Sequence, residues 1–311
     1  MEADKCSLRL GALVLGGLGG VGQAICQELH AQGFFVIATS RRPPSSRVDI
    51  ASSDNADLVI QVTNDDDAAS LLSTLTSALS DMGVHLVTGG GDADSVLSQM
   101  GHRGVSNSDR GSDKCPAVGS SDSGKERERE REAWTGVECL PPMPLSSPSC
   151  RMCLMLHSAY VCTGSVDMGA VQDVGYQTLS ACITGHLHPA LLAIQTIRTL
   201  CPHGSVICMG SDPYTEEAAP DTVCYCVAKA ALQRLVECTQ EDMPFLHCEC
   251  VQLPDMDTGL WQRAGLPVPP DSDAPSVHAV SMVASVAHRL GEYLREEAQH
   301  TVDRSGAVLL V

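Results

Sequence analysis

Short apolar runs alternate with longer amphipathic segments along most of this 311-residue chain. The short runs have the length of buried strands, and the longer segments show the apolar spacing of helices. Strands that alternate with helices predict a doubly wound parallel α/β sheet. We expect seven strands, at Leu10–Leu15, Phe34–Ala38, Asp57–Val62, Val84–Val87, Gly204–Met209, Leu246–Leu253 and Gly306–Val311. Helices are expected at Gln23–Leu29 and at about Asp66–Leu79, Val171–Leu200, Tyr225–Cys238 and Val277–Glu296.

This periodicity stops between residues 95 and 150. The stretch is rich in Ser, Gly, Asp and Pro, and residues 125–132 alternate basic and acidic side chains. A segment with so few apolar residues cannot bury enough surface to offset the entropy lost on ordering. We therefore expect one domain over residues 1–311, with residues 95–150 a disordered, low-complexity loop insertion.

Charge and cysteine content narrow the possible partners and compartment. The chain carries 20 basic and 38 acidic residues, a net charge of −18, which argues against nucleic acid or an anionic membrane and favours a small-molecule substrate. No apolar run approaches the length of a membrane span. A secretory signal begins with a basic region, and the acidic residues Glu2 and Asp4 argue against one here. Fifteen cysteines without an export signal then predict reduced thiols and a cytoplasmic location.

A metal site is not expected. Cys150 and Cys153 have a metal-like or redox-like spacing, but no second close cysteine or histidine pair accompanies them. Structural zinc needs four ligands. Most of the cysteines are therefore expected to behave as small core hydrophobes.

A glycine-rich turn follows the first predicted strand and precedes the first helix. Its glycines fit two spacings, G-x-G-x-x-G from Gly17 to Gly22 and G-x-x-x-G-x-G from Gly16 through Gly20 to Gly22. Such a turn lets the backbone approach a pyrophosphate and aims a helix amino terminus at its charge. We therefore predict a dinucleotide site of the Rossmann type that includes Gly16, Gly17, Gly20, Val21 and Gly22.

Tyr225 and Lys229 lie four residues apart, and on a helix this spacing places both side chains on one face. A tyrosine titrates near 10 and serves as a proton donor at neutral pH only when a nearby cation stabilises its phenolate. Lys229 is placed to do so. The pair predicts proton-transfer chemistry, although any long chain can contain this spacing by chance.

With these landmarks the chain resembles the short-chain dehydrogenase/reductase family over nearly its whole length, the insertion aside. Ser211 lies 14 residues before Tyr225, which is close to the family's usual serine spacing. The resemblance implies that Gly89 and Gly90 also contact the cofactor. One segment and two single positions depart from the family pattern. Thr88–Gly91 stands in place of Asn-Asn-Ala-Gly, Cys182 in place of a catalytic Asn, and Gln61 in place of an adenine-contacting Asp.

One branch of the family, the quinonoid dihydropteridine reductases, resembles the chain in several short segments. These segments are the turn Val14–Gly22, Phe34-Phe35, Ile183–Leu187, Pro220, Ala228–Gln233, and Leu253-Pro254 with Asp257-Thr258. The resemblance implies an NAD(P)H-dependent reductase that regenerates tetrahydropterin, with Tyr225 as proton donor and Lys229 holding the nicotinamide ribose. It also implies a homodimer formed through two long helices. The branch has Ala where this chain has Ser211.

Two other functions stay open. In a generic carbonyl or alcohol oxidoreductase, Ser211 would polarise the substrate oxygen. In a nucleotide-binding pseudoenzyme, the fold and the insertion would form an interaction platform, but Tyr225 and Lys229 argue against it.

The end of the second predicted strand bears on the choice between NADPH and NADH. An acidic residue there selects NADH by bonding the ribose hydroxyls, whereas an arginine pairs with the 2′-phosphate of NADPH. This chain has Ser40, Arg41 and Arg42 at that point and no carboxylate. Solvated surface arginines are the simpler interpretation. The functional one predicts a preference for NADPH.

Overall fold

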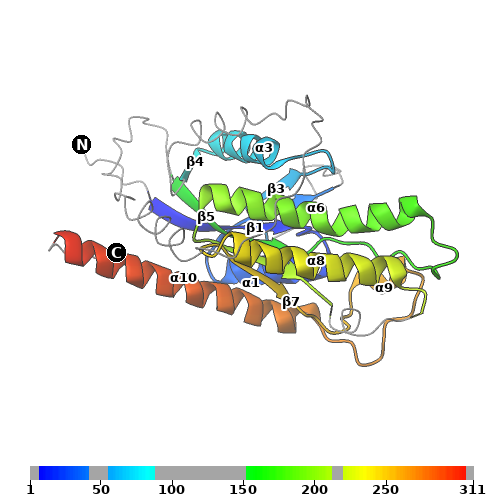
Figure 1. Ribbon diagram of the computed structural model, residues 1–311. Helices are drawn as coiled ribbons and strands as arrows, with labels where there is room; N and C mark the ends of the chain where they lie inside the picture. Colours follow the sequence, from blue (N-terminus) through cyan, green and yellow to red (C-terminus); the bar gives the residue numbers. More distant parts are fainter. Residues whose placement is uncertain (1–6, 42–54, 88–151, 212–219, 306–311) are drawn as a thin grey trace, which may run out of the picture.

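The computed structural model describes residues 7–41, 55–87, 152–211 and 220–305, which form a parallel sheet covered by helices on both faces (Figure 1). The strands are β1 Ser7–Leu15, β2 Phe35–Ser40, β3 Leu58–Gln61, β4 Val84–Val87, β5 Met152–Val161, β6 Ser205–Met209 and β7 His247–Val251. The helices are α1 Gly20–Ala31, α3 Ala68–Asp81, α6 Tyr176–Leu200, α8 Val223–Asp242, α9 Gly259–Arg263 and α10 Pro275–Ser305. The predicted doubly wound fold is confirmed.

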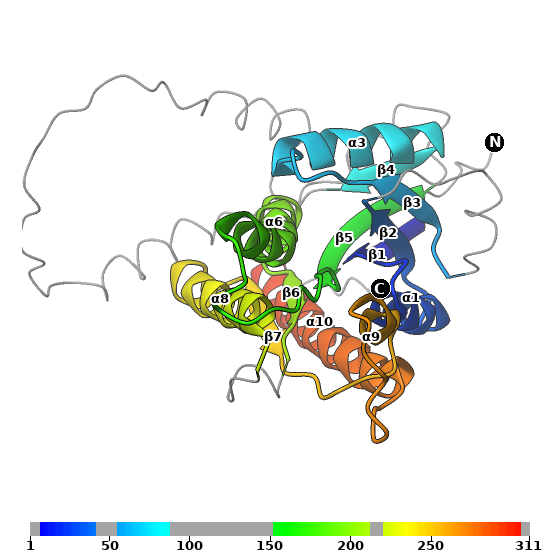
Figure 2. The same cartoon turned by 90° about the vertical axis from the view of Figure 1, so that its right-hand side faces the viewer.

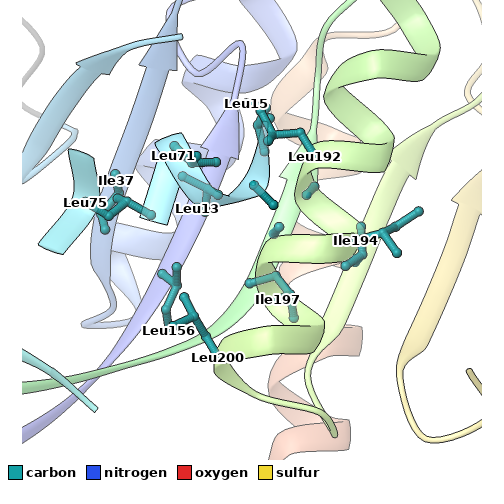
Figure 3. Close-up of a cluster of buried hydrophobic side chains, with 14 of the residues drawn as sticks. Leu13, Leu15, Ile37, Leu71, Leu75, Leu156, Leu192, Ile194, Ile197 and Leu200 are labelled. Carbon is teal, nitrogen blue, oxygen red and sulfur yellow. The ribbon is translucent and has the colours of Figure 1, made fainter. Parts of the chain in front are cut away.

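The sheet separates two apolar layers because successive side chains of a strand point to opposite faces. In β1, Leu13 and Leu15 pack with α3, α6 and α8, while Ala12 and Val14 pack with α1 and α10. Figure 2 shows these two groups of helices on opposite sides of the sheet. The first layer includes the leucine and isoleucine cluster of Figure 3, to which α6 contributes Leu192 and Ile197.

The order of strands across the sheet is β3-β2-β1-β5-β6-β7, and β4 also pairs with β5. β1 pairs with the whole of β5 on one side. On its other side β5 pairs first with β4, from Met152 to Met155, and then with β6, from Ser158 to Val161. The short β4 therefore ends well before the carboxyl edge of the sheet, where ligands of such folds bind.

The central position of β5 corrects the sequence prediction, which assigned no strand between Val87 and Gly204. His157 and Ser158 interrupt the apolar pattern of this segment, yet both are buried. A register shift between Gly11 and Ala12 of β1 lets β5 take up one extra residue at this point. Neither ring nitrogen of His157 has a hydrogen-bond partner, and burial lowers the pKa of its imidazole to about 4.

The other predicted elements are found within a few residues of their expected bounds, except that α10 runs on to Ser305. The predicted strand at Gly306–Val311 and the whole of the predicted insertion lie outside the described residues. Among the helices that are described, none combines the length and apolar character needed to cross a bilayer.

Candidate active site

A cleft lies at the carboxyl edge of the sheet, where the glycine turn and the segments after β5, β6 and β7 meet. The residues that line it are Gly19, Gly20, Val21, Cys162, Thr163, Gly164, His186, Met209, Gly210, Ser211, Tyr225, Lys229, Leu253, Pro254, Asp255, Met256, Thr258, Leu260, Trp261 and Arg263. Of the predicted site residues, Gly20, Val21, Ser211, Tyr225 and Lys229 therefore share one cavity.

The glycine turn needs glycine for reasons of space and of backbone conformation. Gly16 has a φ of +78°, and a Cβ at Gly22 would lie 2.3 Å from the carbonyl oxygen of Gly16. A Cβ at Gly17 would lie 2.7 Å from the Cβ of Ala38 in β2. Gly16, Gly17 and Gly22 thus sit where no side chain fits, whereas a Cβ at Gly19 or Gly20 would lie 3.4 or 3.3 Å from its nearest neighbour. The turn delivers the amino terminus of α1 to the cleft.

Tyr225 and Lys229 occupy the buried face of α8. Their side chains are 8% and 5% exposed, and Lys229 Nζ lies 5.5 Å from the centroid of the Tyr225 ring. Lys229 Nζ also donates a 2.6 Å hydrogen bond to the backbone carbonyl of Met209, the last residue of β6. This bond fixes the ammonium beside the phenol at the base of the cleft.

Burial lowers the pKa of Lys229 to about 8, against the opposing influence of nearby thiols. The ammonium is still largely protonated at neutral pH. Arg263 adds a second cation to the described lining, and Asp255 is its acidic member. A cleft with this balance, in a chain of net charge −18, favours an anionic ligand.

Ser211 follows β6 and is held through its backbone. Its N–H donates a 3.0 Å hydrogen bond to Gln252 Oε1, and Gln252 Nε2 in turn donates to Gln233 Oε1 at 3.3 Å. A Cβ at Gly210 would lie 2.6 Å from Gln252 Oε1, so glycine at that position leaves room for the amide. The Gln252 side chain thereby anchors the backbone of Ser211 in the cleft lining.

The predicted adenine end lies at the carboxyl end of β2, next to the turn. Thr39 Oγ1 accepts a 3.3 Å hydrogen bond from the Gly16 N–H, and Ser40 ends the strand. Arg41 is exposed, and its carbonyl accepts a 3.4 Å bond from Gln61 Nε2. The remaining predicted residues of the cofactor site, Arg42, Gly89 and Gly90, lie outside the described residues.

Sequence reasoning missed the segment that follows β5. Cys162, Thr163 and Gly164 line the cleft directly beside the glycine turn, and a Cβ at Gly16 would lie 2.9 Å from the Cys162 carbonyl oxygen. The sequence predicted that the segment after β4, with Gly89 and Gly90, would occupy this position beside the glycine turn. The available signal was the apolar run Ala159–Val161, which reaches a glycine three residues later.

Cys182 does not line the cleft. Its Sγ donates a 3.8 Å hydrogen bond to the Ser165 carbonyl, and it packs with Cys224 and Ala228. Burial raises the pKa of this thiol to about 11, so it stays protonated at neutral pH. One helical turn later, His186 reaches the cleft instead, although no role was predicted for it. In the described residues, no group of three or more His, Cys, Asp or Glu side chains has a metal-binding arrangement.

Solved structures share this fold across most of the chain. An alcohol dehydrogenase of Thermococcus sibiricus, solved with 5-hydroxy-NADP, is 11% identical, with a TM-score of 0.56 and coverage of 89% of both chains. A short-chain dehydrogenase/reductase of Mycobacterium ulcerans is 13% identical, with a TM-score of 0.56 over 91% of this chain and 84% of that chain. A short-chain oxidoreductase of Thermus thermophilus is 15% identical, with a TM-score of 0.52 over 88% and 95% of the two chains.

No protein-family model matches the sequence, and no curated protein matches it. The similarity is therefore one of fold. The chain has the fold of the short-chain dehydrogenases/reductases, and its cleft brings a glycine turn together with a buried tyrosine and lysine.

Proposed function

We propose that this protein is an NAD(P)H-dependent reductase whose substrate is a quinonoid dihydropterin. The observation that carries the proposal is the burial of Tyr225 and Lys229, 5.5 Å from ring centroid to Nζ, in a cleft that begins at a glycine turn. A proton donor, a neighbouring cation and an anion-binding helix terminus are the groups that such a reduction requires. The fold shared with the short-chain dehydrogenases/reductases supports the same class of reaction.

The cleft suits a dinucleotide on two grounds. The turn at Gly16 and Gly22 has space for backbone alone, so a pyrophosphate can approach the first N–H groups of α1. In this proposal Lys229 binds a ribose hydroxyl, and Ser40 and Arg41 contact the adenosine end. When bound, the nicotinamide supplies the hydride of the reduction.

The protein's own contribution is the proton. Tyr225 donates its phenolic hydrogen to the substrate nitrogen, and the Lys229 ammonium stabilises the phenolate that remains. The bond from Lys229 to the Met209 carbonyl keeps this cation in place through the step. Pterin reduction creates no carbonyl oxyanion, so it has no need of the Ser211 hydroxyl. The resemblance of Ile183–Leu187 and Ala228–Gln233 to dihydropteridine reductases supports the pterin as substrate.

A second candidate function is the reduction of a carbonyl compound. Ser211 lines the same cleft as Tyr225, which favours this reaction because a serine hydroxyl can polarise a carbonyl oxygen. The two candidate functions therefore differ in one respect: carbonyl reduction requires the Ser211 hydroxyl, and pterin reduction does not.

The test is an NADPH or NADH oxidation assay with chemically generated quinonoid dihydropterin, run beside a panel of aldehydes and ketones. Turnover of the pterin, with Ser211→Ala close to unmutated activity, supports the proposal. Turnover of carbonyls, with a loss of about a hundredfold in Ser211→Ala, indicates the second candidate. Cofactor binding without turnover of either class would contradict both and indicate a pseudoenzyme.

A further inference from the structure

The Tyr225 ring has a second neighbour besides Lys229. The imidazole of His186, from α6, packs against it edge to face, with the ring centroids 5.7 Å apart and the planes at 74°. This is the favourable geometry for two aromatic rings. His186 is 1% exposed, so the contact is fully packed.

The orientation of this imidazole is fixed by a hydrogen bond. His186 Nε2 lies 3.1 Å from the Ser165 carbonyl oxygen, and a carbonyl only accepts, so Nε2 carries the hydrogen. Burial, followed by the charge of Lys229, lowers the pKa of His186 to about 4, and the ring is therefore neutral. Lys229 thus remains the cation next to the phenol.

The segment after β5 is shaped around the same ring. Gly164 has a φ of +150°, and a Cβ at this position would lie 2.3 Å from His186 Cε1 and 2.9 Å from each ring nitrogen. Glycine at 164 is therefore a condition for the imidazole to occupy its site. The ring joins three parts of the cleft: the segment after β5, α6 and the face of α8 that carries Tyr225.

We propose that His186 is a positioning residue for Tyr225, which holds the phenol beside Lys229 through the edge-to-face contact and the Ser165 hydrogen bond. The inference rests on the proposed role of Tyr225 as proton donor. The Tyr225 ring lies against both His186 and Lys229, and these contacts restrict its movement in the cleft lining. A small displacement of a reacting group lowers the reaction rate substantially. In the proposed function the cofactor binds through the glycine turn and Lys229, so a change at His186 is expected to affect cofactor binding little.

The first experiment observes Tyr225 without substrate. In protein labelled at the tyrosine rings, the Tyr225 signals are assigned by NMR from their loss in Tyr225→Phe. His186→Leu is expected to shift these signals and to speed the flipping of the Tyr225 ring. His188→Leu is the matched control, because His188 also bonds a backbone carbonyl, that of Asp66 at 2.8 Å, from the same helix. It should leave the Tyr225 signals unchanged.

The second experiment measures turnover. His186→Leu should lower kcat about tenfold with little change in the Kd of NADPH. His186→Phe, which restores a ring at the contact, should recover part of the lost kcat. Tyr225 signals in His186→Leu that match those of His188→Leu would overturn the proposal, as would a His186→Phe no more active than His186→Leu. Absence of turnover in the unmutated protein would reject the proposed function instead, and the NMR comparison would still decide whether His186 positions Tyr225.

Discussion

Lys229 Nζ lies 5.5 Å from the centroid of the Tyr225 ring, and the same nitrogen is bonded to the last carbonyl of β6. A lysine with so little exposure normally lowers the stability of the folded protein, because its charge is removed from water. Its retention next to a phenol at the carboxyl edge of the sheet is the arrangement expected of a functional pair.

Tyr225→Phe tests the proton donor. The substitution removes the hydroxyl and keeps the packing of the ring, so kcat should fall by about a hundredfold or more while the Kd of NADPH hardly changes. Steady-state kinetics and nicotinamide fluorescence measure the two quantities. Tyr176→Phe is the control, because Tyr176 is 82% exposed at the start of α6. A Tyr225→Phe variant with near-full activity would contradict the assignment.

The pH dependence of the rate tests Lys229. Burial lowers its pKa to about 8, so the ammonium loses its proton as the pH rises through that value. Phenolate stabilisation is lost with the charge, and kcat should fall on the alkaline side with a midpoint near pH 8. A rate that stays constant to pH 10 would show that the Lys229 charge does not support the reaction.

The fold was predictable from the sequence where apolar periodicity was uninterrupted, as in β1, β2 and α8. β5 is difficult to predict because strands buried on both faces usually appear as nearly continuous apolar runs. His157 and Ser158 break that rule, and only the tertiary arrangement, with a register shift opposite Gly11, accommodates them. Without β5, the prediction assigned the cleft segment to the residues after β4.

The parts of the candidate site that could be predicted are those whose residues lie close together in the sequence. The glycine turn and the Tyr225–Lys229 pair each lie within a few residues, so the sequence alone indicates them. His186 contacts Tyr225 and packs against Gly164 only after α6 packs on the sheet, and no local spacing signals this. The role of Met209 could not be predicted from the sequence either, because its backbone carbonyl, and not its side chain, accepts the hydrogen bond from Lys229.

Acid sensitivity is expected from His157. Its pKa is lowered to about 4 in the folded protein, against about 6.5 when unfolded, so only the unfolded chain takes up a proton between these values. The free energy of unfolding should therefore fall as the pH drops through this window, by up to about 1.4 kcal/mol per pH unit for this histidine. His186 adds a second contribution of the same sign.

The substitution His157→Phe should raise the free energy of unfolding by about 1 kcal/mol at pH 7, since it removes two unbonded buried nitrogens. It should also reduce the loss of stability at pH 5. Urea unfolding followed by circular dichroism at the two pH values measures both effects. His85→Phe, at an exposed position of β4, should show neither. A His157→Phe variant as acid-sensitive as the unmutated protein would refute this account.

If the chain forms a homodimer through α6 and α8, we expect few apolar side chains to stabilise the contact between the two copies. Most of the apolar residues from Ala190 to Ile194 pack on the chain's own sheet, and the outer surface retains Leu191 and Val227, which are 43% and 40% exposed. α6 and α8, which carry these two residues, lie side by side (Figure 1). We therefore predict that Leu191 and Val227 contribute to the dimer contact.

Light scattering at micromolar concentration should give about twice the 32.8 kDa chain mass for the unmutated protein, and a monomer for Leu191→Glu with Val227→Glu. Val280→Glu, on α10, is the matched control and should remain dimeric. A monomeric mass for the unmutated protein would reject the dimer.

Cofactor choice is expected to depend on the end of β2. Arg41 follows Ser40 there, is exposed, and has no carboxylate beside it in the sequence. A 2′-phosphate offers the Arg41 guanidinium a charge-assisted hydrogen bond, worth about 1.5–3 kcal/mol. NADPH should therefore bind more tightly than NADH.

Replacing Arg41 and Arg42 together by Ala should raise the Kd of NADPH by about ten- to a hundredfold and leave that of NADH nearly unchanged. Nicotinamide fluorescence at one fixed salt concentration measures both constants. Arg234→Ala serves as the control, because Arg234 pairs with Glu237 at 2.6 Å on the exposed face of α8 and should not affect either cofactor. Equal dissociation constants for NADPH and NADH in the unmutated protein would show that the two arginines are solvated surface residues, since a 2′-phosphate contact must favour one cofactor over the other.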